Sequence, residues 1–342
     1  MLHVCPLVGM VTQFPQDYMH LVLLGVMRKI LCLWMTNRWS RTDKNEITEK
    51  LVSYRKHCPS DMARRPRELR EFRNFKATEL RTILCYTGLV AFRNNLSQGV
   101  FRHFLLLVCS LRILLNPVLC KKFNGHAKEW LIEFVKLAPK FYGPEICTFN
   151  MHGLCHLADE GQMYGNLDNI SSFPFENKLC QVKNLIKRPG VTLRQIINRT
   201  MERRTANLQC GCRERKSKFS TPLHSGTLAD EHKHASPFRS VTIDGTKFST
   251  NLRDSCFVTN GKAYLIEKIL KLGPDVLAIA SVFEKIDDLF KYPCASRTVG
   301  IYKVWALTHQ LQTISLKRVQ KSMMMPLPTP GFFVVVVLNS HP

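Results

Sequence analysis

An acid and an imidazole stand one helical turn apart near the start of the chain. They are Asp17 and His20, in the stretch FPQDYMHLVLLGVMRKILCLWM. Side chains at i and i+3 lie on the same face of a helix, so the two could work as a pair. An acid in the first turn is also favoured by the unpaired N–H groups and the dipole of a helix. Spacing alone favours this structural interpretation.

Two histidines with helical spacing form the second group, in the stretch NMHGLCHLADE. His152 and His156 are separated by four residues, with Asp159 and Glu160 nearby. Such a pair can bind a metal, but the segment lacks the H-E-x-x-H order of a metalloprotease. Hydrogen-bonded histidines on a helix are the more common alternative. The close cysteine pair, Cys210 and Cys212, lacks the second pair of ligands that a zinc finger needs.

The third group combines one carboxylate with many cations, in SSFPFENKLCQVKNLIKRPG and the segment after it. Pro174 suits the first position of a helix, which places Glu176 in the first turn. Acids that hold Mg²⁺ or Mn²⁺ beside cations that hold a DNA backbone would suit metal-dependent phosphodiester chemistry. The apolar residues Leu179, Val182, Ile186, Leu193, Ile196, Ile197 and Met201 are expected to turn inward. The predicted DNA-binding residues are Lys178, Lys183, Lys187, Arg188, Arg194, Arg199, Arg203 and Arg204.

The overall charge supports a polyanionic partner. Lys and Arg total 49 against 26 Asp and Glu, which gives a net charge of +23 and indicates nucleic acid as the simplest partner. A basic but merely solvated surface is the alternative. The same two interpretations stay open for the basic segment from Arg64 to Arg81.

The chain is expected to be intracellular, either nuclear or cytoplasmic. Its 13 cysteines are dispersed, many within apolar runs, and read as reduced thiols. No signal peptide is visible at the N-terminus. The two longest apolar runs are interrupted by Arg28-Lys29 and by Arg112, so neither is expected to span a membrane.

Periodicity predicts an α+β protein. The N-terminal two-thirds shows helical spacing, and the C-terminal third has short β-like runs separated by turn signals, which are typical of a small barrel or sandwich. The predicted regions are a mostly helical part over 1–208, a basic polar linker over 209–240 and a β-rich domain over 241–342. The expected helices cover residues 16–37, 44–56, 76–86, 98–115, 118–141 and 147–160.

Several of these stretches together resemble the transposases of CACTA (En/Spm-like) DNA elements and the transposase-domain proteins derived from them. The similarity rests on DYMHLVLLGVMRKIL, RRPRELREFRNFKATELRTILCYTG, FNMHGLCHLADEGQMYGNLDNISSFPFENKL, RDSCFVTNGKAYLIEKIL and YPCASRTVGIYKV. It implies a ribonuclease-H-like nuclease of the DDE type with a helical insertion. Asp17 to His20 matches a D-x-x-H string that follows the second catalytic aspartate. Glu176 matches the glutamate that completes the triad, which uses Mg²⁺ or Mn²⁺.

The chain departs from that pattern at its start. Only about 16 residues precede Asp17, and they contain no acid. The expectation is therefore a truncated ribonuclease-H-like region that retains DNA binding without cleavage. The alternatives are a domesticated DNA- or chromatin-binding protein and a non-functional pseudogene product. The sequence leaves a homo-oligomer open.

Overall fold

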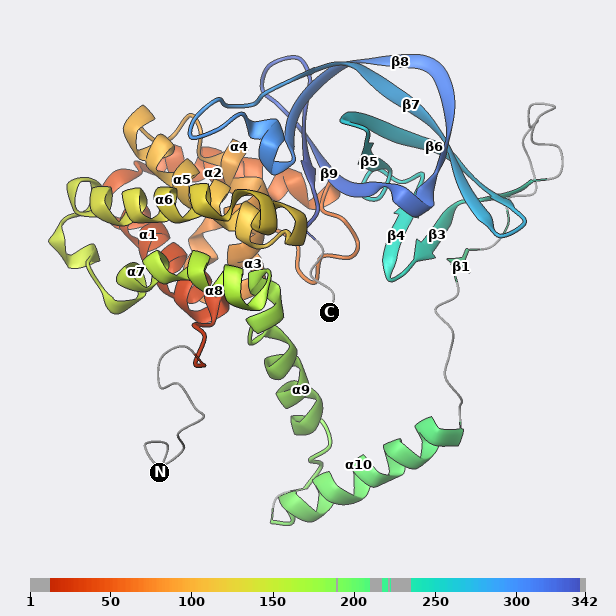
Figure 1. Ribbon diagram of the computed structural model, residues 1–342, viewed down its shortest axis with the longest axis horizontal. Helices are drawn as coiled ribbons and strands as arrows, with labels where there is room; N and C mark the ends of the chain where they lie inside the picture. Colours follow the sequence, from red (N-terminus) through yellow and green to blue (C-terminus); the bar gives the residue numbers. More distant parts are fainter. Residues whose placement is uncertain (1–12, 189, 210–216, 221, 223–234, 339–342) are drawn as a thin grey trace.

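The computed structural model describes residues 13–188, 190–209, 217–220, 222 and 235–338, and it has the expected α+β composition. A helical body forms the N-terminal half of the chain, two helices project from it, and a β-barrel follows (Figure 1). No strand occurs in the described residues before Lys218.

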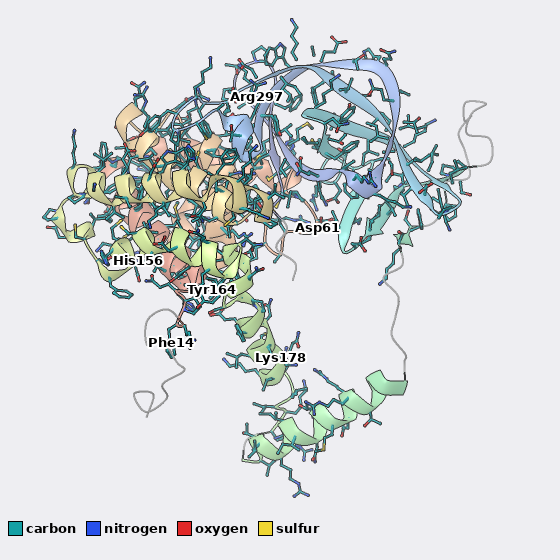
Figure 2. The ribbon with its side chains drawn as sticks, in the orientation of Figure 1. Phe14, Asp61, His156, Tyr164, Lys178 and Arg297 are labelled. Carbon is teal, nitrogen blue, oxygen red and sulfur yellow. The ribbon has the colours of Figure 1, made fainter. Side chains whose placement is uncertain are left out.

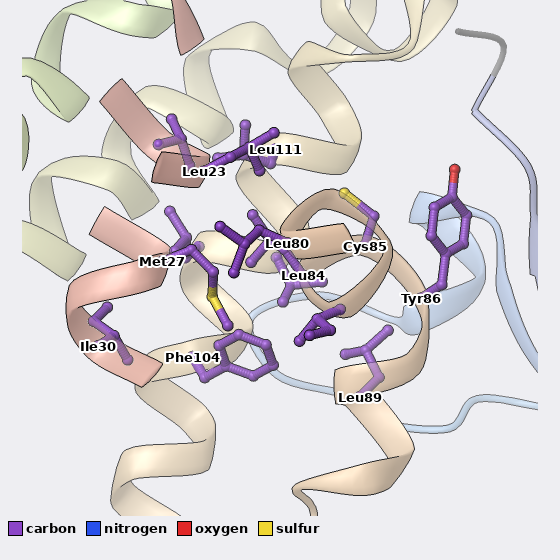
Figure 3. Packing of buried hydrophobic residues seen from close by; sticks show 14 of the residues in the cluster. Leu23, Met27, Ile30, Leu80, Leu84, Cys85, Tyr86, Leu89, Phe104 and Leu111 are labelled. Atoms are coloured by element: carbon purple, nitrogen blue, oxygen red, sulfur yellow. The ribbon is translucent and has the colours of Figure 1, made fainter. Parts of the chain in front are cut away.

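The helical body is built around its first helix, Met19–Arg38, which is π-helical at both ends and α-helical over α1 (Arg28–Leu33). Side chains from this helix meet Leu80, Phe104 and Leu111 of later helices in one apolar cluster (Figure 3). The other α-helices of the body are α2 (Arg41–Ser53), α3 (Ala77–Thr82), α4 (Gly88–Ala91), α5 (Gln98–Leu114), α6 (Pro117–Tyr142), α7 (Phe149–Gly153) and α8 (Leu157–Tyr164).

Local sequence signals set several helix ends. Ser40 and Asp43 form a capping box at the start of α2, where each side chain accepts the backbone N–H of the other. Asn116 caps α6 and is followed by Pro117, which has no N–H to leave unpaired. The six helical segments predicted from periodicity are all present, with boundaries displaced by a few residues.

The C-terminal part is a closed antiparallel barrel. Six strands follow one another in the order β6-β5-β9-β10-β8-β7, and pairing of β6 with β7 closes the ring, while β2 extends it at β6. Of the two folds left open by the sequence, the barrel is therefore confirmed. The strands of the large sheet are β2 (Ser236–Phe238), β5 (Cys256–Thr259), β6 (Lys262–Leu272), β7 (Asp275–Asp287), β8 (Ile301–Ser315), β9 (Gln320–Pro326) and β10 (Phe332–Val336).

A small second sheet stands beside the barrel. It has the order β1-β3-β4, formed by β1 (Lys218–Phe219), β3 (Ser240–Ile243) and β4 (Thr246–Ser249). Residues 209–240, which the sequence presents as a linker, thus contain β1, β2 and the first residue of β3.

The barrel and the helical body share a hydrophobic core. Met323, Met325, Phe333 and Val335 of the barrel belong to the same buried cluster as the first helix and α5. Arg112 of α5 is 1% exposed and donates to the carbonyls of Cys85, Val299 and Val336 at 3.2, 2.7 and 3.0 Å. One guanidinium therefore connects the helical body to two segments of the barrel.

Two further helices leave the body as an arm, namely α9 (Phe173–Lys183) and α10 (Thr192–Gln209) (Figure 1). The expectation that their apolar residues turn inward is wrong for Leu179, Leu193, Ile197 and Met201, whereas Val182, Ile186 and Ile196 are half-buried. Leu179, Leu193 and Met201 are 63%, 70% and 62% exposed, and α9 has no buried residue. The physical reason is that, in the described part of the chain, no helix or strand packs extensively against α9 or α10, so little covers this apolar stripe.

One helix is long and apolar enough to cross a membrane by length and composition, namely Met19–Arg38. Leu23, Met27 and Ile30 lie in the shared core, and core helices of this kind pass the same test. The cysteines of the described residues are free thiols, and Cys85, Cys109 and Cys256 are buried, in line with the expected reduced state.

We expect the Arg112→Met variant to lose about 3 kcal/mol or more of unfolding free energy, because three buried carbonyls lose their donor. Urea denaturation of the full chain measures this loss. The matched control is Arg102→Met, an exposed position on the same helix, which should change stability by about 0.5 kcal/mol or less. Equal effects of the two substitutions would contradict the role given to Arg112.

Candidate functional site

The structure brings Asp17, His20 and Glu176 together. His20 Nδ1 lies 2.5 Å from Asp17 Oδ2, and His20 Nε2 lies 3.4 Å from Glu176 Oε1. Each ring nitrogen thus faces a different carboxylate. The imidazole and Glu176 are more than half exposed, whereas the side chain of Asp17 is only 18% exposed. The site is an open surface constellation at the junction of the first helix and α9.

Asp17 has both the structural and the orienting role that spacing left open. Its Oδ1 accepts the backbone N–H groups of Met19 and Ser172, and its Oδ2 accepts the N–H of His20 as well as the ring. Ser172 lies 155 residues away in sequence, so the same carboxylate that begins the first helix also fixes the start of α9. Burial raises the pKa of Asp17, but these hydrogen bonds from Ser172 and His20 hold it below its usual value.

This geometry orients the histidine for proton transfer. With Nδ1–H donated to Asp17, Nε2 is left facing Glu176 and solvent. An imidazole held by a carboxylate can accept or donate a proton at its other nitrogen. The three residues could therefore move protons at the surface.

The donors at this site do not fit a Mg²⁺ or Mn²⁺ ion held by these residues alone. Both oxygens of Asp17 already accept N–H groups, and hard cations prefer several oxygen ligands to an imidazole. Among the described residues, no group of three or more His, Cys, Asp or Glu side chains is arranged to hold a metal ion. Of the two carboxylates, Glu176 is the one whose oxygens are not taken up by backbone N–H groups.

A buried polar network that the sequence did not reveal lies directly behind the site. Asp168 accepts two hydrogen bonds from Arg81, at 2.6 and 2.9 Å, and one from the Tyr18 hydroxyl at 2.7 Å. Burial alone lowers the pKa of Arg81, but Tyr18 and Asp168 hold it well above its usual value. The network fixes residue 18, next to Asp17, against the segment that leads into α9. No spacing rule connects residues 18, 81 and 168, so sequence reasoning could not find it.

The predicted DNA-binding residues lie along the arm. Lys178, near the middle of α9 in Figure 2, begins a series that continues through α10. Seven of the eight side chains are exposed, and Arg199 is half-buried. Within the described part of the chain, no carboxylate forms an ion pair with any of them. The series comprises Lys178, Lys183, Lys187, Arg188, Arg194, Arg199, Arg203 and Arg204.

The basic segment from Arg64 to Arg81 is partly neutralised within the protein. Arg67 pairs with Glu79 and Glu71, and Arg70 pairs with Glu68. Arg81 is buried on Asp168. The exposed cations without such a partner are Arg64, Arg65, Arg73 and Lys76, so only part of the segment could contact phosphates.

His152 and His156 lie on the outer surface of the helical body, where Figure 2 labels His156. Their Nε2 atoms are 3.3 Å apart and both rings are exposed. The metal role for this pair stays a prediction, because the described residues supply no third ligand of the kinds searched. Cys210 and Cys212 lie outside the described residues.

Comparisons with known proteins bear only on the barrel. Residues 223–338 match a family model described as a domain of unknown function (DUF8592), and this range contains β2 to β10. No curated protein matches the chain. No solved structure matches it either.

We expect Asp17→Ala to lower the free energy of unfolding at neutral pH by about 0.5–2 kcal/mol, the range for replacing a helix-capping residue by Ala. Because folding lowers the pKa of Asp17, the ionised side chain stabilises the folded protein at pH values above its unfolded-state pKa. This stabilisation disappears as the pH falls through about 4 toward the folded-state pKa. Urea denaturation of wild type and variant at several pH values measures the difference. A difference in unfolding free energy between wild type and variant that stays constant from pH 7 to pH 3 would contradict this account.

Proposed function

We propose that the protein is a DNA-binding protein derived from a CACTA-type transposase, and that it contacts the DNA backbone through the arm formed by α9 and α10. The observation that carries the proposal is the unbroken series of unpaired cations on this arm. A chain of net charge +23 that concentrates cations on a projecting element presents a surface suited to phosphates.

The Asp17, His20 and Glu176 constellation supports the derivation from a transposase. The resemblance assigns Glu176 to the acidic triad of a DDE nuclease, and it matches Asp17 to His20 with a string that follows the second catalytic aspartate. Most of the helical body separates Glu176 from the other two in sequence. The fold places His20 in contact with both carboxylates. In the proposal, the helical body is the insertion and the end of a ribonuclease-H-like domain.

The proposed role of this chain is binding rather than strand cleavage. Both carboxylate oxygens of Asp17 already accept hydrogen bonds from N–H groups. At this site, Glu176 is therefore the residue that could offer carboxylate oxygens to a cation. The implied Mg²⁺ or Mn²⁺ chemistry needs further aspartates, which a partner protein or another copy of this chain would have to supply. A DNA-binding role places the protein in the nucleus, or in the cytoplasm before import.

DNA binding through the arm predicts a steep dependence on salt. For duplex DNA, log K should fall with log[salt] by about 0.9 for each phosphate contact. Replacing Lys183, Lys187, Arg188 and Arg194 by Ala should therefore weaken binding and reduce the slope by up to about 3.6. Fluorescence anisotropy with a labelled duplex, measured across a salt series, gives both quantities.

A matched variant distinguishes the effect of the arm on DNA binding from the effect of net charge alone. Replacing Lys121, Lys122, Lys136 and Lys140 of α6 by Ala removes the same four charges from another exposed surface. This variant should keep nearly the wild-type affinity and slope. If the two quadruple variants weaken binding equally, or if affinity ignores salt, the proposed function is wrong.

For cleavage, we expect purified wild-type protein with Mg²⁺ or Mn²⁺ to nick supercoiled plasmid no faster than the Glu176→Ala variant, because the site lacks a full set of oxygen ligands. Gel electrophoresis of the plasmid measures nicking, and an added metal-dependent nuclease confirms that the conditions permit it. Wild-type nicking that Glu176→Ala abolishes would show that the site is catalytic after all.

A further inference from the structure

A cavity of about 270 Å³ lies where the helical body, the start of the arm and the barrel meet. Its wall includes Asp61, which Figure 2 labels between the helices and the barrel, and Phe173 at the first turn of α9. Ligand pockets of proteins are usually about 300–1,000 Å³, so this volume suits a small ligand. The cavity is separate from the surface constellation of Asp17, His20 and Glu176, none of which lines it.

Of the three cations that line the cavity, Arg64 is the one without a carboxylate partner among the described residues. Lys321 pairs with Asp61 and Asp254, and Arg81 pairs with Asp168. Arg64 also lines the cavity and is exposed, with no carboxylate partner in the described part of the chain. A ligand with a single anionic group would therefore find its partner at Arg64.

The remaining wall suits a flat ring with polar edges. Phe173 and Tyr86 contribute aromatic side chains, and most of the lining is apolar. Tyr86 stands at the edge of the buried cluster with its hydroxyl directed away from it (Figure 3). That hydroxyl accepts the N–H of Leu338 and still has its own proton to donate. Asn177 adds an exposed carboxamide, which can pair with the edge of a base.

The surroundings of the cavity favour a nucleotide over other aromatic acids. Asn177 lines the cavity, and the next residue along α9 is Lys178, the first cation of the arm. A phosphate of a nucleotide held in the cavity would therefore meet Arg64, and further phosphates of a longer chain would have the cations of the arm nearby. A simple aromatic acid would use only the first of these contacts.

We propose that the cavity binds a single nucleotide unit, with the base against Phe173 and the hydroxyl of Tyr86 and the phosphate at Arg64. The unit comes either from a free mononucleotide or from an unpaired nucleotide at a DNA end. The second source rests on the proposed DNA binding, whereas the first does not.

Calorimetric titration of the full chain with dAMP and dTMP tests the cavity directly. Both should bind, while deoxyadenosine, thymidine and phenylacetate should bind about tenfold more weakly or worse, because each lacks the phosphate or the base. Arg64→Ala should cause a similar loss for dAMP, and Asn177→Ala should weaken binding too. The controls Arg65→Ala and Asn184→Ala change exposed neighbours that do not line the cavity and should leave binding unchanged.

Failure to bind either nucleotide at millimolar concentration would overturn the proposal, as would equal binding of phenylacetate or equal effects of Arg64→Ala and Arg65→Ala. Displacement of dAMP by a duplex with a single-stranded tail, and not by a blunt duplex, identifies a DNA end as the source. Binding of dAMP without such displacement identifies a free nucleotide. Loss of salt-dependent binding to blunt duplex in the arm variant is a separate readout, so each proposal can fail alone.

Discussion

The arrangement of the whole molecule depends on the buried guanidinium of Arg112. A charge in the interior is tolerated only when its donors are satisfied, and here three carbonyls from distant segments satisfy them. Burial lowers the pKa of Arg112, and none of the described carboxylates forms an ion pair with it. Gly300, at φ 71°, lets the chain pass close to Nη2 at the start of β8. The helical body and the barrel therefore fit together in one way, which positions the elements around the cavity.

A second buried cluster reinforces this arrangement. Lys321 of β9 is 5% exposed and binds Asp61 of a helical-body loop together with Asp254 of the barrel. Asp254 also accepts the N–H of Ser60. Removing one member would leave a buried charge without a partner. The loss of folding free energy would then be far larger than the stabilisation that an exposed ion pair contributes. Buried charged contacts thus hold the barrel in a fixed position against the helical body. In the described residues, α9 and α10 make no contact with Arg112 or Lys321.

In the arm, the sequence pattern predicted the helices correctly but did not predict whether their apolar face would be buried. Leu179, Leu193 and Met201 have helical spacing, and the helices formed as expected. Periodicity indicates that one face is apolar, but whether that face is covered depends on other elements. In the described structure it is uncovered, and the cations of the same helices are unpaired. Both features make the arm a surface for contact with another molecule.

Local physics in the sequence determined the helices, the short strands and the cap that Asp17 gives to the first helix, because each of these depends on neighbouring residues. The sequence also singled out Asp17, His20 and Glu176 as candidate site residues. Their spacing could not show that the three side chains meet. Only the tertiary structure decided that His20 bridges the two carboxylates, that Asp17 spends its oxygens on N–H groups and that Arg81 is buried on Asp168. These outcomes depend on contacts between residues far apart in the chain, and no local periodicity encodes such contacts.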